Sequence, residues 1–321
     1  MYHVIINPAS RSGKGLRIWN NEVEPALRKA GVPYRFYLSG QAGDTTRFMR
    51  DLCLREKEDM FVIVLGGDGT VNEALQGMDD SRRVTLGYIP TGSSNDLARA
   101  LKLSRDPAKL LRQILDGTHA HMMDLGILTY ESDSEVTSRL HRPPVHKSRY
   151  FIVSSGIGFD AAVCEEALHS KIKDIMNKLG LGKLTYLGIA LRQLFASKAV
   201  SGKLTLEDNA PVDIGNMLFT ACMLHRFEGG GFMFAPDADA RDGLLNLCAV
   251  GDLPKLLILF ALPTAFRGKH YMFRGITPYR SGHLTIETTL PLWVHTDGEV
   301  ARRSDHICVT CEKDAIQIML P

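Results

Sequence analysis

The sequence predicts a parallel α/β domain followed by a second domain made mainly of antiparallel strands. Over residues 1–125, short apolar runs alternate with segments of helical period, which is the pattern of a parallel sheet with crossover helices. From about residue 126 the pattern changes to short strand-like runs separated by turn residues at hairpin spacing. The chain of 321 residues is also longer than one core usually supports. We therefore expect two domains, with a boundary near residue 125.

The first domain should contain four strands, each followed by a helix. Met60 to Leu65 is a continuous apolar run, which is typical of a central parallel strand covered on both faces. The expected strands are residues 4–7, 34–38, 60–65 and 84–89, and the expected helices are residues 16–30, 45–57, 70–78 and 94–101.

The second domain should contain short strands with two helical inserts. A polar segment with two prolines, residues 131–148, is expected to be a loop between strands. The expected strands are residues 127–130, 150–153, 203–206, 217–222, 244–250, 283–287, 293–296 and 307–311, and the inserts lie near residues 164–194 and 254–266.

The composition is that of an ordinary globular protein. Hydrophobic residues make up 45% and charged residues 23%, and the formal net charge of +2 gives no argument for a nucleic-acid partner. The most apolar stretch, Leu253 to Leu262, is roughly half of the ~20 residues needed to span a bilayer. The chain opens without the pattern of a signal peptide. We therefore expect a soluble, cytoplasmic protein.

Six cysteines are scattered along the chain, and a cytoplasmic protein of this size does not need disulfides. Cys308 and Cys311 have C-x-x-C spacing, but no second Cys or His pair accompanies them in the sequence. Inert thiols are therefore favoured over a redox or metal site.

Two glycine-rich loops occupy equivalent positions along the chain. The strand at residues 60–65 runs into Gly66-Gly67-Asp68-Gly69-Thr70, and the strand at residues 84–89 runs into Pro90-Thr91-Gly92-Ser93-Ser94-Asn95-Asp96. A helix is expected after each loop. In an open parallel sheet the carboxyl ends of the strands meet at one edge, where ligands bind. Both loops should therefore face one crevice.

The residue types of these loops suit a polyphosphate. Glycines let backbone N–H groups approach phosphate oxygens, and each following helix directs its N-terminus at the anion. Thr70 and Ser94 are candidate caps for those helices. A carboxylate beside phosphates is repulsive unless a cation lies between them, so Asp68 indicates Mg²⁺. The alternative, two tight turns without a ligand, does not explain why the pattern repeats.

A third loop, Asn7 to Gly15, follows the first strand and resembles a P-loop only superficially. Pro8 stands where the first glycine belongs, and Gly15 replaces the hydroxyl residue that follows the lysine. A Walker-type NTPase is therefore not expected, although a basic loop at the mouth of the same crevice is.

Several motifs together resemble the diacylglycerol kinase catalytic domain, and among its branches the soluble bacterial diacylglycerol and lipid kinases, which are related to sphingosine kinases. They are NPASRSGKG from Asn7, GGDGTVNE from Gly66, PTGSSNDLAR from Pro90, SSGIGFDA from Ser154, GGGFMFAPDADARDGLL from Gly229 and TDGE from Thr296. The resemblance implies a three-layer α/β domain, a β-sandwich domain over residues 126–313 and a C-terminal tail, residues 314–321, that returns to the first domain. It also implies an ATP-dependent kinase that acts on a lipid hydroxyl.

The resemblance also assigns roles to individual residues. Glu299 matches the family's proposed general base, with Asp297 as the alternative, and Asp68 joins the catalytic group. Asp242 and the carbonyls of Leu244 and Asp239 match a structural Mg²⁺ site. The residues expected to bind ATP are Asn7, Ser10, Ser39, Gly66, Gly67, Asp68, Gly69, Thr70, Asn72, Glu73, Thr91, Ser93 and Asn95, with Asp96 shaping the same crevice.

Two rival functions stay open from the sequence. A nicotinamide dinucleotide kinase shares GGDGT, but PTGSSNDLAR stands where that family carries a different loop. A non-catalytic nucleotide- or lipid-binding relative is disfavoured by the intact Asp68, Asp297 and Glu299. Diacylglycerol, phosphatidylglycerol, a sphingoid base and a polyprenol all suit an apolar cleft as acceptors.

Two apolar segments, residues 172–195 and 253–266, leave two interpretations open: most of their residues pack on the β domain, or they contact a membrane surface transiently. We expect part of them to line an apolar cleft that opens toward the ATP crevice. Basic residues follow the second segment. Dimers are common in the family, so a homodimer is the partner to test first.

Overall fold

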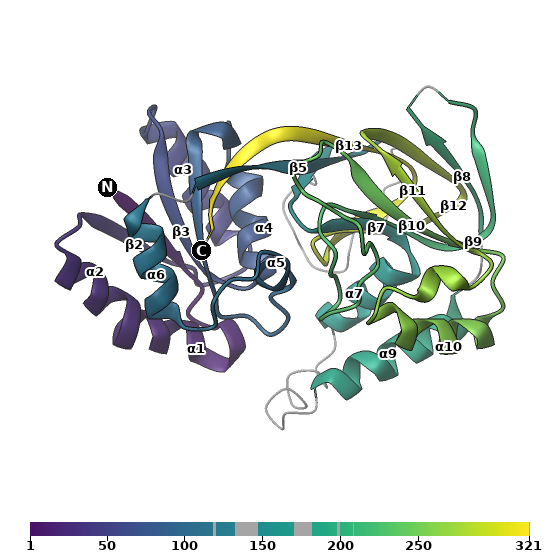
Figure 1. Cartoon of the computed structure of the whole chain (residues 1–321), viewed down its shortest axis with the longest axis horizontal. Helices are drawn as coiled ribbons and strands as arrows, with labels where there is room; N and C mark the ends of the chain where they lie inside the picture. The colour runs from purple at the N-terminus through teal and green to yellow at the C-terminus, as the bar shows by residue number, and fades with distance from the viewer. Residues whose placement is uncertain (118–119, 132–146, 170–181, 198–199, 208, 321) are drawn as a thin grey trace.

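The computed structural model describes residues 1–117, 120–131, 147–169, 182–197, 200–207 and 209–320. Figure 1 shows two lobes that are joined by a pair of long strands. The expected loop at residues 131–148 and the middle of the expected insert at residues 164–194 lie mostly outside the described residues.

The N-terminal lobe is built on a parallel sheet in the order β2-β1-β3-β4. Its strands are β1 (Tyr2–Ile6), β2 (Tyr34–Leu38), β3 (Met60–Gly66) and β4 (Val84–Pro90). Helices α1 (Ser10–Ile18), α2 (Glu24–Ala30) and α6 (Pro107–Asp116) pack on one face, with a π-helical segment, Trp19–Val23, between the first two. Helices α3 (Asp44–Arg55) and α4 (Asp68–Gly77) pack on the other face.

The two faces of the sheet use alternate residues of the same strands, as the strand period requires. On β3, Leu65 packs with the α1, α2 and α6 side, whereas Val64 packs with Met49 and Leu75 on the α3 and α4 side. Burial on both faces explains the continuous apolar run and confirms the three-layer α/β domain.

The C-terminal lobe is made of antiparallel strands, which confirms the expected β-sandwich domain. Its strands are β6 (Ser148–Phe151), β7 (Ser154–Gly158), β8 (Val200–Leu206), β9 (Val212–Met223), β10 (Leu245–Gly251), β11 (Ile276–Ser281) and β12 (His283–Thr296). Three helices pack on one face through a separate apolar cluster: α7 (Phe159–His169), α9 (Gly182–Ala196) and α10 (Lys255–Ala265).

Two long strands, β5 (Ala120–Tyr130) and β13 (Glu299–Met319), connect the lobes (Figure 1). Strand β13 pairs first with β12 and then with β5, and near its end Gln317 and Ile318 pair in parallel with β4. The described strands therefore belong to one hydrogen-bonded sheet that runs through both lobes, with β5, β6 and β8 attached beside its main path. The buried carboxylate of Asp124 accepts hydrogen bonds from Asp314 N and Gly243 N, and so supports the irregular point where β13 passes between lobes.

Several expected elements were wrong in extent. The expected helix at residues 16–30 is divided into α1, the π-helical segment and α2. The expected strands at 283–287 and 293–296 are one strand, β12, whose register shifts between Glu287 and Leu292, because Pro291 cannot donate a ladder hydrogen bond. Helix α6 and strands β7 and β11 were not expected.

The six cysteines are free thiols, and Cys308 and Cys311 form no disulfide. None of the described helices has both the length and the apolar character needed to cross a bilayer.

Candidate active site at the junction of the lobes

The loops that follow β1, β2, β3 and β4 meet at one edge of the parallel sheet. Thr91 N donates to the carbonyl of Gly66 over 2.7 Å, so the two glycine loops are joined directly. A β-carbon at Gly92 would lie 2.6 Å from the Cα of Gly67, which only glycine permits. We expected the two loops to face one crevice because both follow strand ends at this edge of the sheet. The contact between their backbones supports that expectation.

Side chains from the other two loops join the same edge. Asn7 Nδ2 donates to Thr70 Oγ1 over 3.2 Å, and the hydroxyls of Ser10 and Thr91 are 2.7 Å apart. Ser39 Oγ donates to the carbonyl of Ile6 over 3.3 Å, at the neighbouring strand end. The structure thus brings Asn7, Ser10, Ser39 and the glycine loops together.

The loop after β1 has an unusual backbone. Arg11, Ser12 and Gly13 are consecutive residues in the left-handed region, with φ of 46°, 58° and 86°. Non-glycine residues rarely adopt this conformation, and such strain gathers at functional sites. A β-carbon at Gly15 would overlap Asn7 and Ser10, so this glycine allows the loop to close.

Asp68 lies in the first turn of α4 with its side chain only partly exposed. Asp68 Oδ2 accepts a hydrogen bond from Asp96 N over 2.8 Å, and Oδ1 accepts one from Tyr88 OH over 3.3 Å. Burial raises the pKa of Asp68 to about 7, and the carboxylates of Asp96 and Asp297 act in the same direction. The site therefore disfavours the ionised form of Asp68 until a cation arrives.

The expected caps were wrong. Helix α4 is preceded by Gly67, and helix α5 (Asp96–Ala100) is preceded by Asn95 in a left-handed conformation; neither has a side-chain cap. Thr70 lies inside α4, and Ser93 and Ser94 are exposed. On α5, however, the carboxylate of Asp68 accepts from the first N–H group, at Asp96, whereas α4 begins at the glycine loop with no side-chain acceptor at its N-cap.

Two residues that follow the glycine loop hold the lobes and helices together. The buried Asn72 donates through Nδ2 to Asp297 Oδ2 over 2.9 Å and to the carbonyl of Tyr150. Glu73 accepts from Gly43 N over 3.0 Å. Both were expected among the ATP-binding residues, and their contacts lie within the protein.

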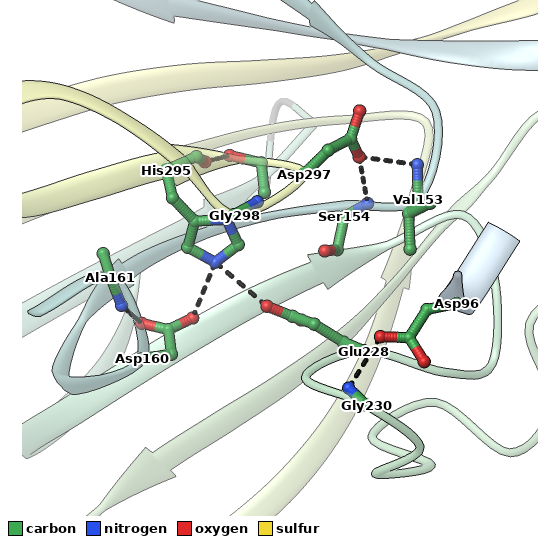
Figure 2. A network of polar contacts seen from close by, with 11 residues as sticks. Asp96, Val153, Ser154, Asp160, Ala161, Glu228, Gly230, His295, Asp297 and Gly298 are labelled. Atoms are coloured by element: carbon green, nitrogen blue, oxygen red, sulfur yellow. Dashed lines mark hydrogen bonds and ion pairs between the residues drawn. The ribbon is translucent and has the colours of Figure 1, made fainter. Parts of the chain in front are cut away.

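Asp297 and Glu299 lie in the turn between β12 and β13 and have different surroundings. The carboxylate of Asp297 accepts four hydrogen bonds, from Asn72 Nδ2 and from the backbone N–H groups of residues 152, 153 and 154. Two of them are drawn in Figure 2. Glu299 instead reaches the glycine loop, since a β-carbon at Gly69 would lie 2.8 Å from Glu299 Oε1.

Helix α5 makes the second connection between the lobes. Asp96 Oδ2 accepts from Gly230 N over 2.7 Å (Figure 2). Asp96 Oδ1 pairs with Arg99 over 2.9 Å. Arg99 also lies over the ring of Phe227, with its guanidinium 5.7 Å from the ring centre. The loop at residues 227–232 therefore docks on α5.

The acidic turn expected to hold a structural cation is occupied by protein donors. Asp242 Oδ2 pairs with Arg280 over 2.6 Å, and Asp242 Oδ1 accepts from Leu244 N. The carbonyl of Asp239, which was the expected ligand there, accepts from Asp242 N over 3.4 Å. A cation would have to displace Arg280, so the side chains as they stand do not form a ready coordination shell.

Sequence reasoning missed a buried group beside the Asp297–Glu299 turn. Figure 2 shows His295 between the carboxylates of Asp160 and Glu228. In the part of the chain that the structure describes, these three make up the single group with three metal-type ligand atoms within 4.8 Å. One signal for this group was present in the sequence: His295 lies in a predicted strand, two residues before Asp297.

Comparison with known proteins agrees with this architecture. Residues 1–127 match the family described as diacylglycerol kinase catalytic domain, and residues 152–320 match the YegS C-terminal NAD kinase beta sandwich-like domain. The chain therefore belongs to the family of bacterial diacylglycerol kinase-like lipid kinases.

Individual relatives cover nearly the whole chain. The YtlR protein of Bacillus subtilis (strain 168) is 28% identical over 305 residues, with 92% of each chain covered. A diacylglycerol kinase of the same strain is 26% identical over 301 residues, which cover 92% of this chain and 88% of the relative. A crystal structure of a diacylglycerol kinase from Bacillus anthracis str. Sterne has the same fold, with a TM-score of 0.70 at 19% identity over 100% of this chain and 96% of the other.

Asp68→Asn should stabilise the metal-free protein at alkaline pH. Folding raises the pKa of Asp68, so the protonated side chain contributes to the free energy of unfolding. That contribution is complete below the pKa of Asp68 in the unfolded chain and is lost as pH rises through about 7. Asn cannot ionise, and its amide can still accept from Asp96 N. With a metal chelator present, the melting temperature of the variant should exceed that of wild type by about 2 °C or more at pH 8.5. The difference between the two melting temperatures should be smaller at pH 5. A variant that is less stable at pH 8.5 contradicts this account.

The structural Mg²⁺ site at Asp242 remains a prediction. A ligand that binds only the folded state adds RT ln(1 + [L]/Kd), about 2.7 kcal/mol at a hundredfold excess over Kd. Added Mg²⁺ should raise the melting temperature of wild type, chelator should reverse the rise, and Asp242→Ala should abolish it. An equal rise in wild type and Asp242→Ala would show that this turn does not bind the ion.

Proposed function

We propose that this protein transfers the γ-phosphate of ATP to a hydroxyl group of a membrane lipid such as diacylglycerol. The observation that carries the proposal is the position of Glu299, whose carboxylate lies against Gly69 of the glycine loop although 230 positions separate them in the sequence. A candidate base and a candidate phosphate cradle therefore belong to the same site.

The edge of the parallel sheet fits a nucleotide triphosphate. The close approach of Gly67 and Gly92 leaves backbone where side chains would otherwise fill the space. The start of α4, which has no side-chain cap, and the strained loop at Arg11 to Gly13 suit anionic oxygens. Asn7, Ser10, Thr70 and Thr91 would add hydroxyl and amide donors around the phosphates.

Asp68 would serve the cation that accompanies ATP. Its carboxylate is held by Asp96 N and Tyr88 OH at the start of α4. Bound Mg²⁺ supplies positive charge that favours the ionised carboxylate and offsets the charge of the phosphates.

Glu299 suits the role of general base better than Asp297 does. Asp297 already accepts four hydrogen bonds, which leaves its oxygens poorly placed to take a proton from an alcohol. Glu299 lies at the start of β13, close to Gly69. Asp297 would then hold the turn, while Glu299 would remove the proton from the attacking hydroxyl.

An exposed apolar surface on the C-terminal lobe supports a lipid acceptor. We call it the α10 patch; it contains Leu256, Leu257, Phe260, Phe266 and Met272, whose exposed fractions run from 43% to 74%. The opposite side of α10 packs into the lobe through Ile258, Ala261 and Ala265. A helix that is apolar all round must be covered by something on its outer side.

The α10 patch is edged by charge and connected to the site. Arg267, Lys269 and Arg274 are exposed beside it and suit anionic headgroups. The ring of Phe266 stacks on Phe232 with centres 4.1 Å apart, and Phe232 belongs to the loop that docks on α5. A lipid drawn from a membrane at this surface would arrive near the proposed phosphate site. In the other segment expected to contact the membrane, Phe195 is 56% exposed, and residues 172–181 lie outside the described residues.

The transfer reaction is tested with γ-labelled ATP, Mg²⁺ and a panel of dispersed lipids, with NAD as a rival acceptor. Wild type should label a lipid and not NAD. Glu299→Gln should lower kcat by roughly 10²- to 10⁴-fold with little change in KM for ATP, because only proton removal is lost. Labelling of NAD alone would replace the proposal with a nicotinamide dinucleotide kinase. A larger loss from Asp297→Asn, in a variant that folds normally, would move the role of base to Asp297.

The α10 patch is tested by sedimentation with vesicles that contain anionic lipid. The double variant Leu256→Asp/Phe260→Asp should sediment at least about tenfold less than wild type, because it places charge where apolar surface would enter the headgroup layer. Leu54→Asp is the matched control, since Leu54 is 63% exposed on α3 of the other lobe. Equal sedimentation of all three proteins would mean that the patch does not contact membranes.

A further inference from the structure

A buried histidine and two carboxylates lie directly beneath the turn that carries Glu299. His295 is fully buried at the end of β12, Asp160 lies in the first turn of α7, and Glu228 precedes the Gly229–Gly231 turn. His295 Nε2 is 3.2 Å from Asp160 Oδ2 and 3.1 Å from Glu228 Oε1 (Figure 2). None of these residues has a role in the proposed function.

The other nitrogen of the ring holds the turn itself. Gly298 N donates to His295 Nδ1 over 3.2 Å, and Gly298 lies between Asp297 and Glu299 with a left-handed φ of 81°. A backbone N–H can only donate, so Nδ1 must be the acceptor and the ring proton must lie on Nε2. That proton points at both carboxylates.

This tautomer favours a proton-bridged group over a metal centre. A cation at Nε2 would need the lone pair there and therefore a proton on Nδ1, which would face the Gly298 N–H. The carboxylates satisfy the Nε2–H instead. Burial raises the pKa of Asp160, and although burial alone would lower the pKa of His295, the carboxylates of Glu228 and Asp160 raise it, so the group retains protons. The Gly298 N–H requires the lone pair of Nδ1, which places the shared proton between Nε2 and the carboxylates.

Burying this group lowers the stability of the folded protein, which points to a role other than stability. Glu228 is 9% exposed, and its Oε2 has no hydrogen-bond partner within the described part of the chain. An unsatisfied buried carboxylate oxygen is unfavourable. A β-carbon at Gly156 would overlap Asp160, so the backbone of β7 leaves space for the group.

The same group is linked to the nucleotide loops. Glu228 is two residues from Gly230, whose N–H donates to Asp96 over 2.7 Å, and Asp96 N donates to Asp68 over 2.8 Å. His295 therefore lies between the turn that carries Glu299 and the loop that docks on α5 (Figure 2).

We propose that His295 is a positioning residue, which Asp160 and Glu228 orient through Nε2 and which holds the Asp297–Gly298–Glu299 turn through Nδ1, so that Glu299 stays against the glycine loop. The proposal rests on the proposed role of Glu299 as the base. It requires the contacts of Nε2 with the carboxylates and the contact of Nδ1 with Gly298 N to be made together. Two substitutions of His295 remove these contacts one at a time.

Two amide variants test the two ends of the ring. His295→Asn places an acceptor where Nδ1 stands but cannot reach the carboxylates, whereas His295→Gln reaches the carboxylates but loses the acceptor for Gly298. The first readout is hydrogen exchange of the Gly298 amide, which does not depend on catalysis. Exchange should become at least tenfold faster in His295→Gln and stay slow in His295→Asn.

The second readout is the kinetics of lipid phosphorylation. His295→Gln should lower kcat at least tenfold and leave KM for ATP within twofold, and His295→Asn should lose less. His225→Asn is the matched control, because His225 is also buried but its Nε2 has no hydrogen-bond partner among the described residues. It should lower the melting temperature and leave kcat within twofold.

Several results would overturn the proposal. Slow exchange of Gly298 in His295→Gln would mean that Nδ1 does not hold the turn, and an equal loss of kcat in His225→Asn would reduce the effect to general destabilisation. A rise in melting temperature on adding Zn²⁺ or Mn²⁺, present in wild type and absent in His295→Asn, would make the group a metal site. If Glu299→Gln keeps full activity, the proposed base fails, while the exchange measurement still tests the role of His295.

A further variant serves if His295→Gln does not fold. Glu228→Leu removes one of the two acceptors of the ring, together with a buried carboxylate oxygen that lacks a partner among the described residues, and leaves Asp160 to accept from Nε2. It should lower kcat several-fold, and the melting temperature is measured beside it to show that the variant is folded. An unchanged kcat would contradict the positioning role.

Discussion

The junction of the two lobes depends on the carboxylate of Asp297. This side chain accepts hydrogen bonds from Asn72 on α4 and from the N–H groups of residues 152, 153 and 154 on the other lobe. Four donors on one carboxylate fix its position more firmly than an ion pair would. Glu299, two residues later, is thereby held against Gly69. Without this anchor, the turn at the start of β13 would rely on the hydrogen bonds from Gly298 N to His295 and from Asp297 N to the carbonyl of Ser154.

The same arrangement gathers negative charge at the site where an anionic nucleotide is proposed to bind. Burial raises the pKa of Asp68 to about 7 and also raises that of Asp96, so the protein without ligands carries these carboxylates at a cost in stability. A cation bound with the proposed nucleotide would reduce that cost. Conformational strain at Arg11 and Ser12 is a second cost at the same edge. Both costs lie where the nucleotide is proposed to bind, which is where a stability cost is expected to serve function.

Local patterns predicted much of this site, and long-range pairing accounts for most of what they missed. The strand-loop-helix units around Gly66 and Pro90 were visible in sequence, because apolar period and glycine position are local properties. Strand β13 was predicted only over residues 307–311, because its 21 residues exchange partners from β12 to β5 and β4 along the way. The His295 group joins residues 135 positions apart, and no local pattern marks such a contact.

The central claim is that the glycine loops and the Asp297–Glu299 turn form one phosphoryl-transfer site. A crystal structure with a non-hydrolysable ATP analogue and Mg²⁺ tests it most directly. The account predicts that the terminal phosphate lies between the Gly66–Thr70 loop and Glu299, with the carboxylate of Glu299 within reach of an acceptor hydroxyl directly or through one water. Phosphates bound away from Gly67 and Gly92, or a Glu299 turned away from them, would contradict it.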